Sequence, residues 1–304
     1  MPETLNDVLE SPELTRLATG FKFTEGPLWH PDGYFYFVDI RTSLLYRIVP
    51  GAEPVVVREN TNGSNGTTFD LEGRLVLCES DTRRIVRVAG DGSGDVEVLT
   101  ERFEGGRYNR PNDVICRSDG TLYFTDPGLR VPLNEREVPY ACIYRIATDG
   151  EVSLAIGCEY PNGLAFTPDE TKLYASNTRW STYIHEFALD DGGSVTSRRI
   201  FADMSHEYPT ENPLDMLRGT LVTNGVPDGM KVDAEWRVFC TGRGGVWVFD
   251  ASGERIGIIE TPEVCANVAF GGDDLRTLFL TASTSVYSMR VHTPGNPHPW
   301  YARR

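Results

Sequence analysis

The sequence predicts an all-β fold, a six-bladed β-propeller with four-stranded blades in which a strand near the N-terminus closes the last blade. A strand–turn–strand pattern recurs six times along the 304 residues. The copies are 40, 47, 50, 66 and 39 residues apart, which leaves room for four short strands in each. Long amphipathic helical patterns are absent, and this argues against an α/β barrel or a doubly wound sheet.

Each copy opens on a polar residue and continues as a short apolar run, a turn and a second apolar run. In the fourth copy, Asn162 precedes Gly163–Phe166, the turn is Pro168–Glu170, and Leu173–Ser176 is the returning run. A turn of this composition between two such runs is typical of paired strands. We call the polar first residue of each copy its opener. The residue eight positions after each opener lies in the turn, and these six residues, the turn column, are Gly33, Gly73, Gly120, Glu170, Trp236 and Leu275.

Further β-rich runs predict the third and fourth strands of the blades. They are Leu44–Ile48 and Pro54–Val57 in the first copy, Ile85–Val88 and Val96–Leu99 in the second, and Ile143–Ile146 and Val152–Ala155 in the third. A unit with four such runs is the size of one propeller blade.

The last copy is one strand short. After Asn267 it contains three β-rich runs, Val268–Phe270, Thr277–Leu280 and Ser285–Met289. We expect Leu14–Ala18 to supply the missing strand, because this closes the ring and removes an exposed sheet edge. The expected organisation is one β-propeller domain over residues 1–304, with the propeller at about 14–291 and a tail at 292–304.

Two segments interrupt the repeat, Pro127–Pro139 and Ala202–Val226. If each innermost strand runs from its opener to the turn, the second strand returns to the opener's end of the ring. Loops after second strands, and segments that lead into openers, then share one face. Both insertions are therefore expected on the face that carries the openers.

Composition narrows the classes of partner. The chain has 29 Lys and Arg against 44 Asp and Glu, a net charge of −15, so a nucleic acid is not an expected partner. The first residues show no basic and apolar leader, and no apolar run is long enough to span a membrane, so we expect a cytoplasmic protein without a membrane partner. Six scattered cysteines are expected to be free thiols, and the sequence leaves the oligomeric state open.

The openers suggest a metal site at the axis of the ring. All six side chains end in a carbonyl or carboxylate oxygen, and they are Glu25, Asn65, Asn112, Asn162, Asp228 and Asn267. Such a set without a cation would place acceptors against acceptors. Ca²⁺ suits it best, because Ca²⁺ takes about 6 to 8 oxygen ligands in flexible geometry. Mg²⁺ and Mn²⁺ fit the same donors, and Zn²⁺ fits less well without His or Cys. The alternative is that the Asn-Gly and Asp-Gly steps only begin strands.

Several motifs resemble those of the SMP-30/gluconolactonase/luciferin-regenerating-enzyme family. The resemblance runs from about Thr24 to Val291. Its main motifs are Glu25-Gly-Pro-x-Trp29, Arg110-Pro-Asn-Asp113, Pro161-Asn-Gly-Leu-Ala-Phe166 and Pro227-Asp-Gly-Met-Lys-Val-Asp233. The resemblance implies a six-bladed propeller with one catalytic divalent cation, usually Ca²⁺, and hydrolysis of a sugar lactone such as gluconolactone.

The same resemblance implies roles for individual residues. Glu25, Asn162 and Asp228 correspond to the protein ligands of the metal. Asn112 corresponds to a further ligand or a substrate contact, and Arg110 to a substrate contact. Asn177 stands where an Asp is frequent in the family, on the rim of the expected substrate face, and is assigned to substrate binding.

The expected reaction is attack of water on a lactone carbonyl that the cation polarises. Asp228 is the expected general base, because it would contact both metal and water. Asp39, Glu79 and Asp126, each fourteen residues after an opener, are alternative bases or anchors beside the site. Two alternatives remain open: a hydrolase of organophosphates or other esters at the same metal, and a calcium-binding propeller without enzymatic activity.

Overall fold

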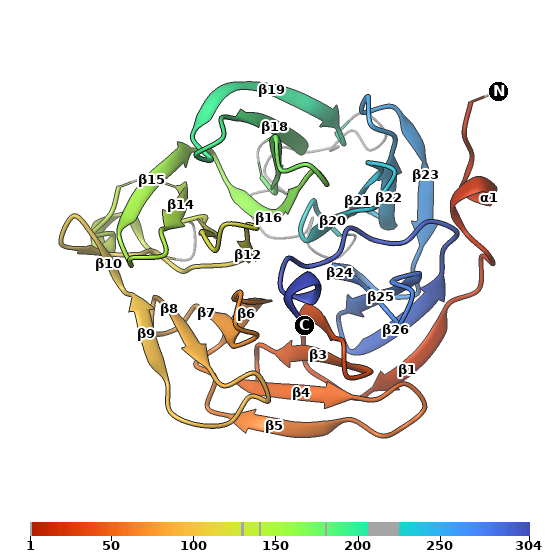
Figure 1. Ribbon diagram of the computed structural model, residues 1–304, viewed down its shortest axis with the longest axis horizontal. Coiled ribbons are helices and arrows are strands. Elements are labelled where there is room, and N and C mark those ends of the chain that lie inside the picture. Colours follow the sequence, from red (N-terminus) through yellow and green to blue (C-terminus); the bar gives the residue numbers. More distant parts are fainter. Residues whose placement is uncertain (1, 129–130, 140, 180, 206–224) are drawn as a thin grey trace.

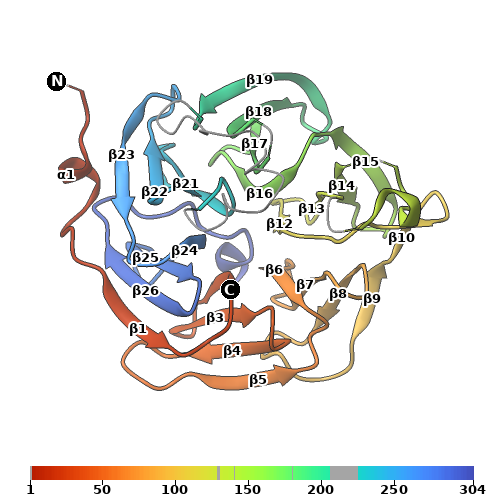
Figure 2. The ribbon, with the colours of Figure 1, turned by 180° about the vertical axis from the view of Figure 1, so that it is seen from behind.

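The computed structural model describes residues 2–128, 131–139, 141–179, 181–205 and 225–304. Within them, six antiparallel four-stranded sheets surround a central axis as the blades of a propeller (Figure 1). The prediction of a six-bladed β-propeller is confirmed. Viewed from behind, the first strands of the blades again lie around the centre and the fourth strands at the periphery (Figure 2).

Blades 1 to 3 follow the chain order from the axis outward. Blade 1 contains β2 (Thr24–His30), β3 (Tyr34–Asp39), β4 (Leu44–Ile48) and β5 (Val55–Glu59). Blade 2 contains β6 (Ser64–Phe69), β7 (Leu75–Glu79), β8 (Arg84–Val88) and β9 (Glu97–Thr100). Blade 3 contains β12 (Val114–Cys116), β13 (Leu122–Asp126), β14 (Cys142–Ile146) and β15 (Val152–Gly157).

Blades 4 to 6 repeat this order, except that the last blade takes its outer strand from the N-terminal region. Blade 4 contains β16 (Pro161–Phe166), β17 (Lys172–Asn177), β18 (Tyr183–Leu189) and β19 (Val195–Asp203). Blade 5 contains β20 (Met230–Val232), β21 (Val238–Gly242), β22 (Gly245–Phe249) and β23 (Arg255–Glu260). Blade 6 contains β24 (Cys265–Gly271), β25 (Thr277–Ala282), β26 (Ser285–Arg290) and β1 (Thr15–Thr19).

Short elements lie outside the blades. They are α1 (Leu5–Val8), the hairpin of β10 (Arg102–Phe103) with β11 (Gly106–Arg107), and the 3-10 turns η1 (Leu133–Glu135) and η3 (Tyr301–Arg303). No helix in the described part of the chain is long and apolar enough to cross a membrane. All six cysteines are free thiols, as predicted.

The turn column adopts one backbone conformation in all six blades. Gly33, Gly73 and Gly120 have positive φ, and so do the non-glycine residues Glu170 and Trp236 at the equivalent points, followed by Leu275 in the last blade. Positive φ is uncommon for residues with a side chain, so its recurrence at this position reflects the turn rather than the residue type. The constant spacing from opener to turn in the sequence thus corresponds to the same turn conformation in all six blades.

The ring is closed as the sequence predicted. Strand β1 pairs antiparallel with β26, and Thr19 lies opposite Ser285. A further bridge joins Leu9 to Val291. The earliest segment of the propeller is therefore hydrogen-bonded to the last, which leaves no gap between blades 6 and 1.

The apolar core lies mainly between the blades. One buried cluster, for example, joins Tyr36 and Val38 of blade 1 to Phe69, Leu75 and Val86 of blade 2. Each blade therefore packs against its neighbours through both faces, and consecutive residues of middle strands such as β3 and β7 are apolar for that reason.

Glycines after the openers allow the inner strands to approach one another closely. A Cβ atom on Gly163 would lie 2.3 Å from the Asp228 carbonyl oxygen, and one on Gly229 would lie 1.9 Å from the side chain of Asn267. Gly26 and Gly66 occupy the same position in blades 1 and 2. Only a residue without a side chain fits these contacts, so the glycines fix the width of the channel at this level.

Hydroxyl groups join neighbouring blades at the same end of the channel. Thr125 of blade 3 donates to the Asn162 carbonyl oxygen at 2.9 Å, and Ser176 of blade 4 donates to that of Asp228 at 2.7 Å. Thr241 of blade 5 donates to the carbonyl oxygen of Ala266, the residue before the opener of blade 6, at 3.1 Å. These bonds hold the openers of successive blades in a fixed relation.

The C-terminal tail crosses the far end of the channel, over the centre of Figure 1. The N–H groups of Gly295 and Asn296 donate to Leu275 and Val232 of blades 6 and 5. The Tyr301 hydroxyl donates to the Trp29 carbonyl oxygen at 2.5 Å. The tail therefore bridges several blades on the side opposite the openers.

We expect Gly163→Ala to destabilise the protein by about 1–3 kcal/mol, the usual cost of overpacking, because the added methyl group collides with the backbone of blade 5. Gly157→Ala is the matched control, since a Cβ at Gly157 meets nothing within 4 Å. Chemical denaturation of both variants measures the difference. Equal stability of the two variants would contradict the packing described for the inner strands.

Candidate metal centre

The six openers lie together at one end of the central channel. Four of them belong to inner strands, and Asn112 and Asp228 lie two residues before β12 and β20. The inner strands β2, β6, β16 and β24 carry an irregular register beside the opener. Such a bulge re-aims side chains, and here it accompanies every opener that lies inside a strand.

Glu25 and Asn267 are directly bonded across the junction of blades 1 and 6. The Asn267 Nδ2 donates to Glu25 Oε2 at 3.0 Å, and the Gly26 N–H donates to the same oxygen at 2.8 Å. The Asn267 Oδ1 instead accepts the Val268 N–H at 2.9 Å. Asn267 therefore orients the carboxylate of Glu25, and its own oxygen is already used, which the sequence-based ring of six donors did not anticipate.

The amide of Asn162 is fixed by a hydroxyl that sequence reasoning missed. Thr178 Oγ1 donates to the Pro227 carbonyl oxygen at 2.7 Å, so it accepts from Asn162 Nδ2, 3.0 Å away. This fixes which end of the amide is oxygen. The Asn162 Oδ1 is buried and has no hydrogen-bond partner among the described residues.

The other openers complete the ring. Asn65 Oδ1 is a second buried acceptor without a partner in the described part of the chain. Asn112 is buried, and Asp228 is half-buried. The close contact of Gly229 with Asn267 and the bond from Thr178 to Pro227 place Asp228 between Asn267 and Asn162. Glu25, Asn162 and Asp228 thus belong to one contiguous arc, with Asn112 on the adjoining blade.

Asp113 and Lys231 are two charged groups in the channel that the repeat analysis did not single out. Asp113 occupies the position that glycine takes in four blades, and its carboxylate accepts N–H groups from Val114 at 2.8 Å and Leu164 at 3.4 Å. Lys231 lies three residues after Asp228, and its ammonium donates to the Met230 carbonyl oxygen at 2.9 Å. The sequence signal for Asp113 was that it stands directly after its opener, where four other copies have glycine.

Burial dominates the electrostatics of the channel. Burial raises the pKa of Glu25 to about 7, and the nearby charge of Asp113 adds to the rise. Burial likewise raises the pKa of Asp113 and lowers that of Lys231, while each of these two charges favours the ionised form of the other. The site therefore disfavours ionised carboxylates unless a cation accompanies them.

The donor set fits a divalent cation of the calcium type. Two buried amide oxygens have no hydrogen-bond partner among the residues that the structure describes, and Glu25 would ionise more readily beside positive charge. Unsatisfied buried acceptors are rare in proteins, and a hard cation is the partner that satisfies several at once. The predicted ligands Glu25, Asn162, Asp228 and Asn112 supply carboxylate and amide oxygens of the required kind.

Asp39, Asp126 and Asn177 share one structural role. Each accepts backbone N–H groups from the segment that leads into its opener: Asp39 from Lys22 and Phe23, Asp126 from Asn109 and Arg110, and Asn177 from Tyr160. Burial raises the pKa of Asp126 to about 6. These side chains anchor the segments that lead into the openers, which is one of the two roles left open for Asp39 and Asp126. Glu79 instead accepts from Thr82 and Arg84 of its own loop.

Arg110 and Asn177 lie at the rim of the ring face. The guanidinium of Arg110 pairs with Asp81, and its Nε has no partner among the described residues. The amide nitrogen of Asn177 donates to the carbonyl oxygens of Arg179 and Ser181 at 2.9 and 2.6 Å. Arg110 thus retains donor capacity, whereas Asn177 is committed to its loop. Most of the predicted Ala202–Val226 insertion, residues 206–224, lies outside the described residues.

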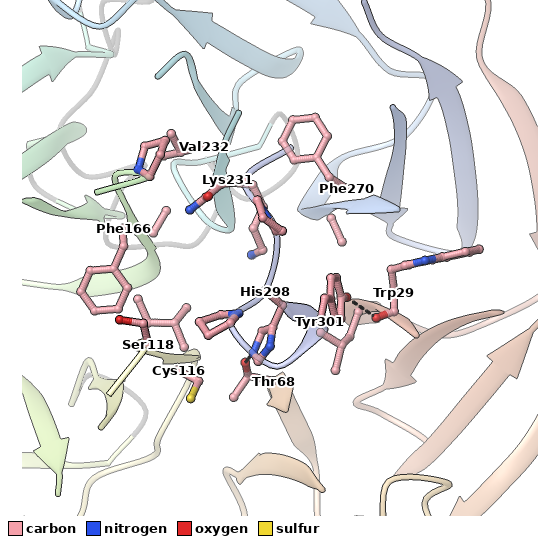
Figure 3. Close-up of a pocket in the computed structure, with 18 of the residues that line it drawn as sticks. Trp29, Thr68, Cys116, Ser118, Phe166, Lys231, Val232, Phe270, His298 and Tyr301 are labelled. Atoms are coloured by element: carbon pink, nitrogen blue, oxygen red, sulfur yellow. Dashed lines mark hydrogen bonds between the residues drawn. The ribbon is translucent and has the colours of Figure 1, made fainter. Parts of the chain in front are cut away.

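A cavity of about 540 Å³ occupies the channel beyond the ring, toward the tail. Figure 3 shows Trp29, Phe166 and Phe270 around it, with the amine of Lys231 directed toward its interior. His298 accepts the Trp300 N–H through Nδ1, so its Nε2 donates to Thr68 Oγ1 at 3.2 Å, and burial lowers its pKa to about 4. The cavity therefore lies between the ring of openers and the C-terminal tail.

Comparison with known proteins identifies the family. Residues 23–284 match the model of the SMP-30/gluconolactonase/LRE-like region. A gluconolactonase of Zymomonas mobilis is 32% identical over 92% of this chain and 81% of the relative. A pentonolactonase of Haloferax volcanii is 32% identical over 89% of this chain and 85% of the relative.

A solved structure extends the likeness to three dimensions. The gluconolactonase of Xanthomonas campestris superposes with a TM-score of 0.82 at 32% identity, covering 94% of this chain and 92% of that one. The superposition and the family match both cover the blades of this chain that carry the openers. The chain belongs to the SMP-30/gluconolactonase/LRE-like family.

Proposed function

We propose that the protein is a sugar lactonase that opens a lactone such as gluconolactone with a divalent cation, Ca²⁺ first among the candidates. The observation that carries the proposal is the ring of oxygen-bearing side chains, in which the buried side-chain oxygens of Asn65 and Asn162 have no hydrogen-bond partner in the described part of the chain. The lactonase class is supported by relatives that are a gluconolactonase and a pentonolactonase, each 32% identical over most of the chain.

The ligand set proposed for the cation is Glu25, Asn162, Asp228 and Asn112. Asn267 holds the Glu25 carboxylate, and Thr178 holds the Asn162 amide, so two of the ligands are preorganised before any cation binds. When bound, the cation would polarise the lactone carbonyl and stabilise the negative charge that develops on its oxygen. Preorganised ligands reduce the reorganisation needed for both binding and reaction.

Asp228 is the proposed general base. It is a carboxylate of the ring that remains half-buried, so it is partly accessible to solvent. It would accept the proton of the attacking water and return it to the leaving alkoxide as the ring opens. Arg110 is proposed to contact the substrate through its guanidinium, and Asn177 to shape the rim through the loop that it holds.

Purified protein is expected to release acid from gluconolactone or a related aldonolactone, and chelation is expected to abolish the reaction until a divalent cation is restored. A lactone panel, an organophosphate and an aryl ester, each with and without EDTA, measure this. Turnover that resists the chelator would exclude the metal mechanism. Calcium binding without turnover of any substrate would instead favour the non-enzymatic propeller.

Asp228→Asn is expected to lower kcat by at least about 100-fold even at saturating Ca²⁺, because removal of a general base typically costs 10²–10⁴-fold. Glu25→Gln should act mainly on Ca²⁺ affinity, so excess Ca²⁺ should restore much of its rate. Asp95→Asn and Glu53→Gln are matched controls at exposed positions. If the rate of Asp228→Asn recovers with Ca²⁺ as that of Glu25→Gln does, Asp228 is a ligand and not the base.

Calcium affinity is expected to rise with pH up to about 7. The metal-free protein keeps Glu25 protonated below this pH because burial raises its pKa to about 7, so Ca²⁺ must displace a proton there. Affinity should therefore fall by up to about tenfold per pH unit below 7 through this group. Titration calorimetry in buffers of different ionisation enthalpy measures the released proton, and Glu25→Gln should lose this component.

A further inference from the structure

The cavity between the ring of openers and the C-terminal tail is a second candidate site in the channel. Its volume of about 540 Å³ lies within the range of roughly 300–1,000 Å³ that is usual for small-molecule sites. Its walls come from the inner strands of all six blades, and the tail lines its far end. The proposed lactone reaction uses the openers and the rim, and it assigns no role to this cavity.

The repeat places one equivalent residue of every blade in the wall of the cavity. The residue three positions after each opener lines it, and five of these six residues are uncharged. They are Leu28, Thr68, Ile115, Ala165, Lys231 and Phe270. Lysine is rarely found in such a wall unless its ammonium group has a partner. The lysine at this position therefore calls for a reason other than the packing of the strands.

The ammonium group of Lys231 has donor capacity left for a ligand. Figure 3 shows the amine directed toward the interior of the cavity. Its Nζ donates to the Met230 carbonyl oxygen at 2.9 Å, and it forms no ion pair among the described residues. Because an ammonium group has three N–H donors, two remain. Burial lowers the pKa of Lys231, and an anion beside it would favour the ammonium form.

The other polar groups of the inner wall are neutral or already hydrogen-bonded. The Thr67 hydroxyl donates to a backbone carbonyl oxygen of blade 1 at 2.8 Å, and that of Thr68 accepts from His298. Burial lowers the pKa of His298 to about 4 and raises that of Cys116 to about 12, so both are neutral near pH 7. Within the described part of the chain, Lys231 is thus the cationic group of this wall.

The cavity opens on the far face of the propeller. Its exposed lining residues lie in the tail and in the turns of blades 3 and 4, and they include Ser118, Asp169 and Arg303. The Arg303 guanidinium donates to the Ser118 carbonyl oxygen at 3.3 Å. The Asp169 carboxylate accepts the Thr171 N–H in its own turn, and the Glu170 carboxylate accepts the Ser118 N–H. A ligand can therefore enter between the tail and these turns without passing the openers.

The surroundings of the ammonium group indicate the class of ligand. Trp29, Phe166 and Phe270 border the same space (Figure 3), and an apolar body would remove their surfaces from water. Two N–H donors on one ammonium suit a single carboxylate. A phosphate or a sugar would bring more polar groups than these walls can satisfy, and each unsatisfied group would oppose binding.

We propose that this cavity is a binding site for a small organic monocarboxylate, held by an ion pair with the Lys231 ammonium and by contact of its apolar body with Trp29, Phe166 and Phe270. Lys231 gives the site its preference for an anion, and the aromatic side chains give it affinity for the body. The site is separate from the proposed metal centre and does not depend on it.

The test uses three probes that share a phenylpropyl body and differ in charge, namely 3-phenylpropionate, 3-phenyl-1-propanol and 3-phenylpropylamine. Calorimetry with the full chain at pH 7 measures their Kd values. The acid should bind at least about tenfold more tightly than the alcohol, and the amine should bind most weakly. Non-specific association with a protein of net charge −15 would favour the amine instead.

Lys231→Met should weaken binding of the acid by on the order of tenfold and leave that of the alcohol within about threefold, because it removes the charge and keeps an unbranched side chain. Lys22→Met is the matched control at an exposed position, and it should leave the affinity for the acid within about twofold. Ala165→Met narrows the cavity without changing its charge, so it should weaken the acid and the alcohol alike.

The inference is overturned if the acid does not bind at up to about 10 mM, or if it binds no more tightly than the alcohol. It is also overturned if Lys231→Met leaves the affinity for the acid within about twofold, or if Lys22→Met lowers it as much. Melting curves accompany every variant. If Lys231→Met does not fold, the order of the three probes and the effect of Ala165→Met decide. None of these outcomes bears on the chelator test of the proposed lactonase.

Discussion

The close approach of the inner strands at the axis is the constraint on which the rest of the structure depends. Gly163 and Gly229 allow adjacent backbones to touch, and hydroxyls such as Thr125 and Ser176 then bridge from blade to blade. Because the strands are held at this spacing, the residue before each glycine has to end near the axis. The constraint that packs the propeller also assembles the ring of oxygens.

The same close approach of the inner strands raises the free energy of ionised carboxylates at the axis. Carboxylates brought together from several blades lose hydration, which raises the pKa of Glu25 and Asp113. The fold offsets this cost with oriented N–H donors, with the amide of Asn267 and with the ammonium of Lys231. A protein with a net charge of −15 thus retains a buried positive group where its carboxylates converge.

The sequence alone could predict the features that recur in every copy of the repeat, but few of the features that depend on contacts between neighbouring blades. The constant offset from opener to turn predicted a turn at residues such as Glu170, and the missing strand of the last copy predicted β1. The direction of an amide could not be predicted: the oxygen of Asn267 is taken by its own backbone, whereas that of Asn162 is not. That difference depends on contacts with other blades. Lys231 was not singled out because the other copies have uncharged residues three positions after the opener. The path of the tail over the channel could not be predicted because the tail lies outside the repeat.

Closure of the ring by β1 has a consequence for the order of synthesis. Thr19 and Ser285, whose hydroxyls lie 2.9 Å apart, are separated by 266 residues. At roughly 5–20 residues per second, β1 leaves the ribosome on the order of 10–50 s before β26 exists to pair with it. A strand whose backbone N–H and C=O groups stay unpaired for this long can pair with strands of other nascent chains. Its composition, Thr-Arg-Leu-Ala-Thr, is correspondingly polar, with the outward residues Thr15 and Arg16 exposed even in the finished blade.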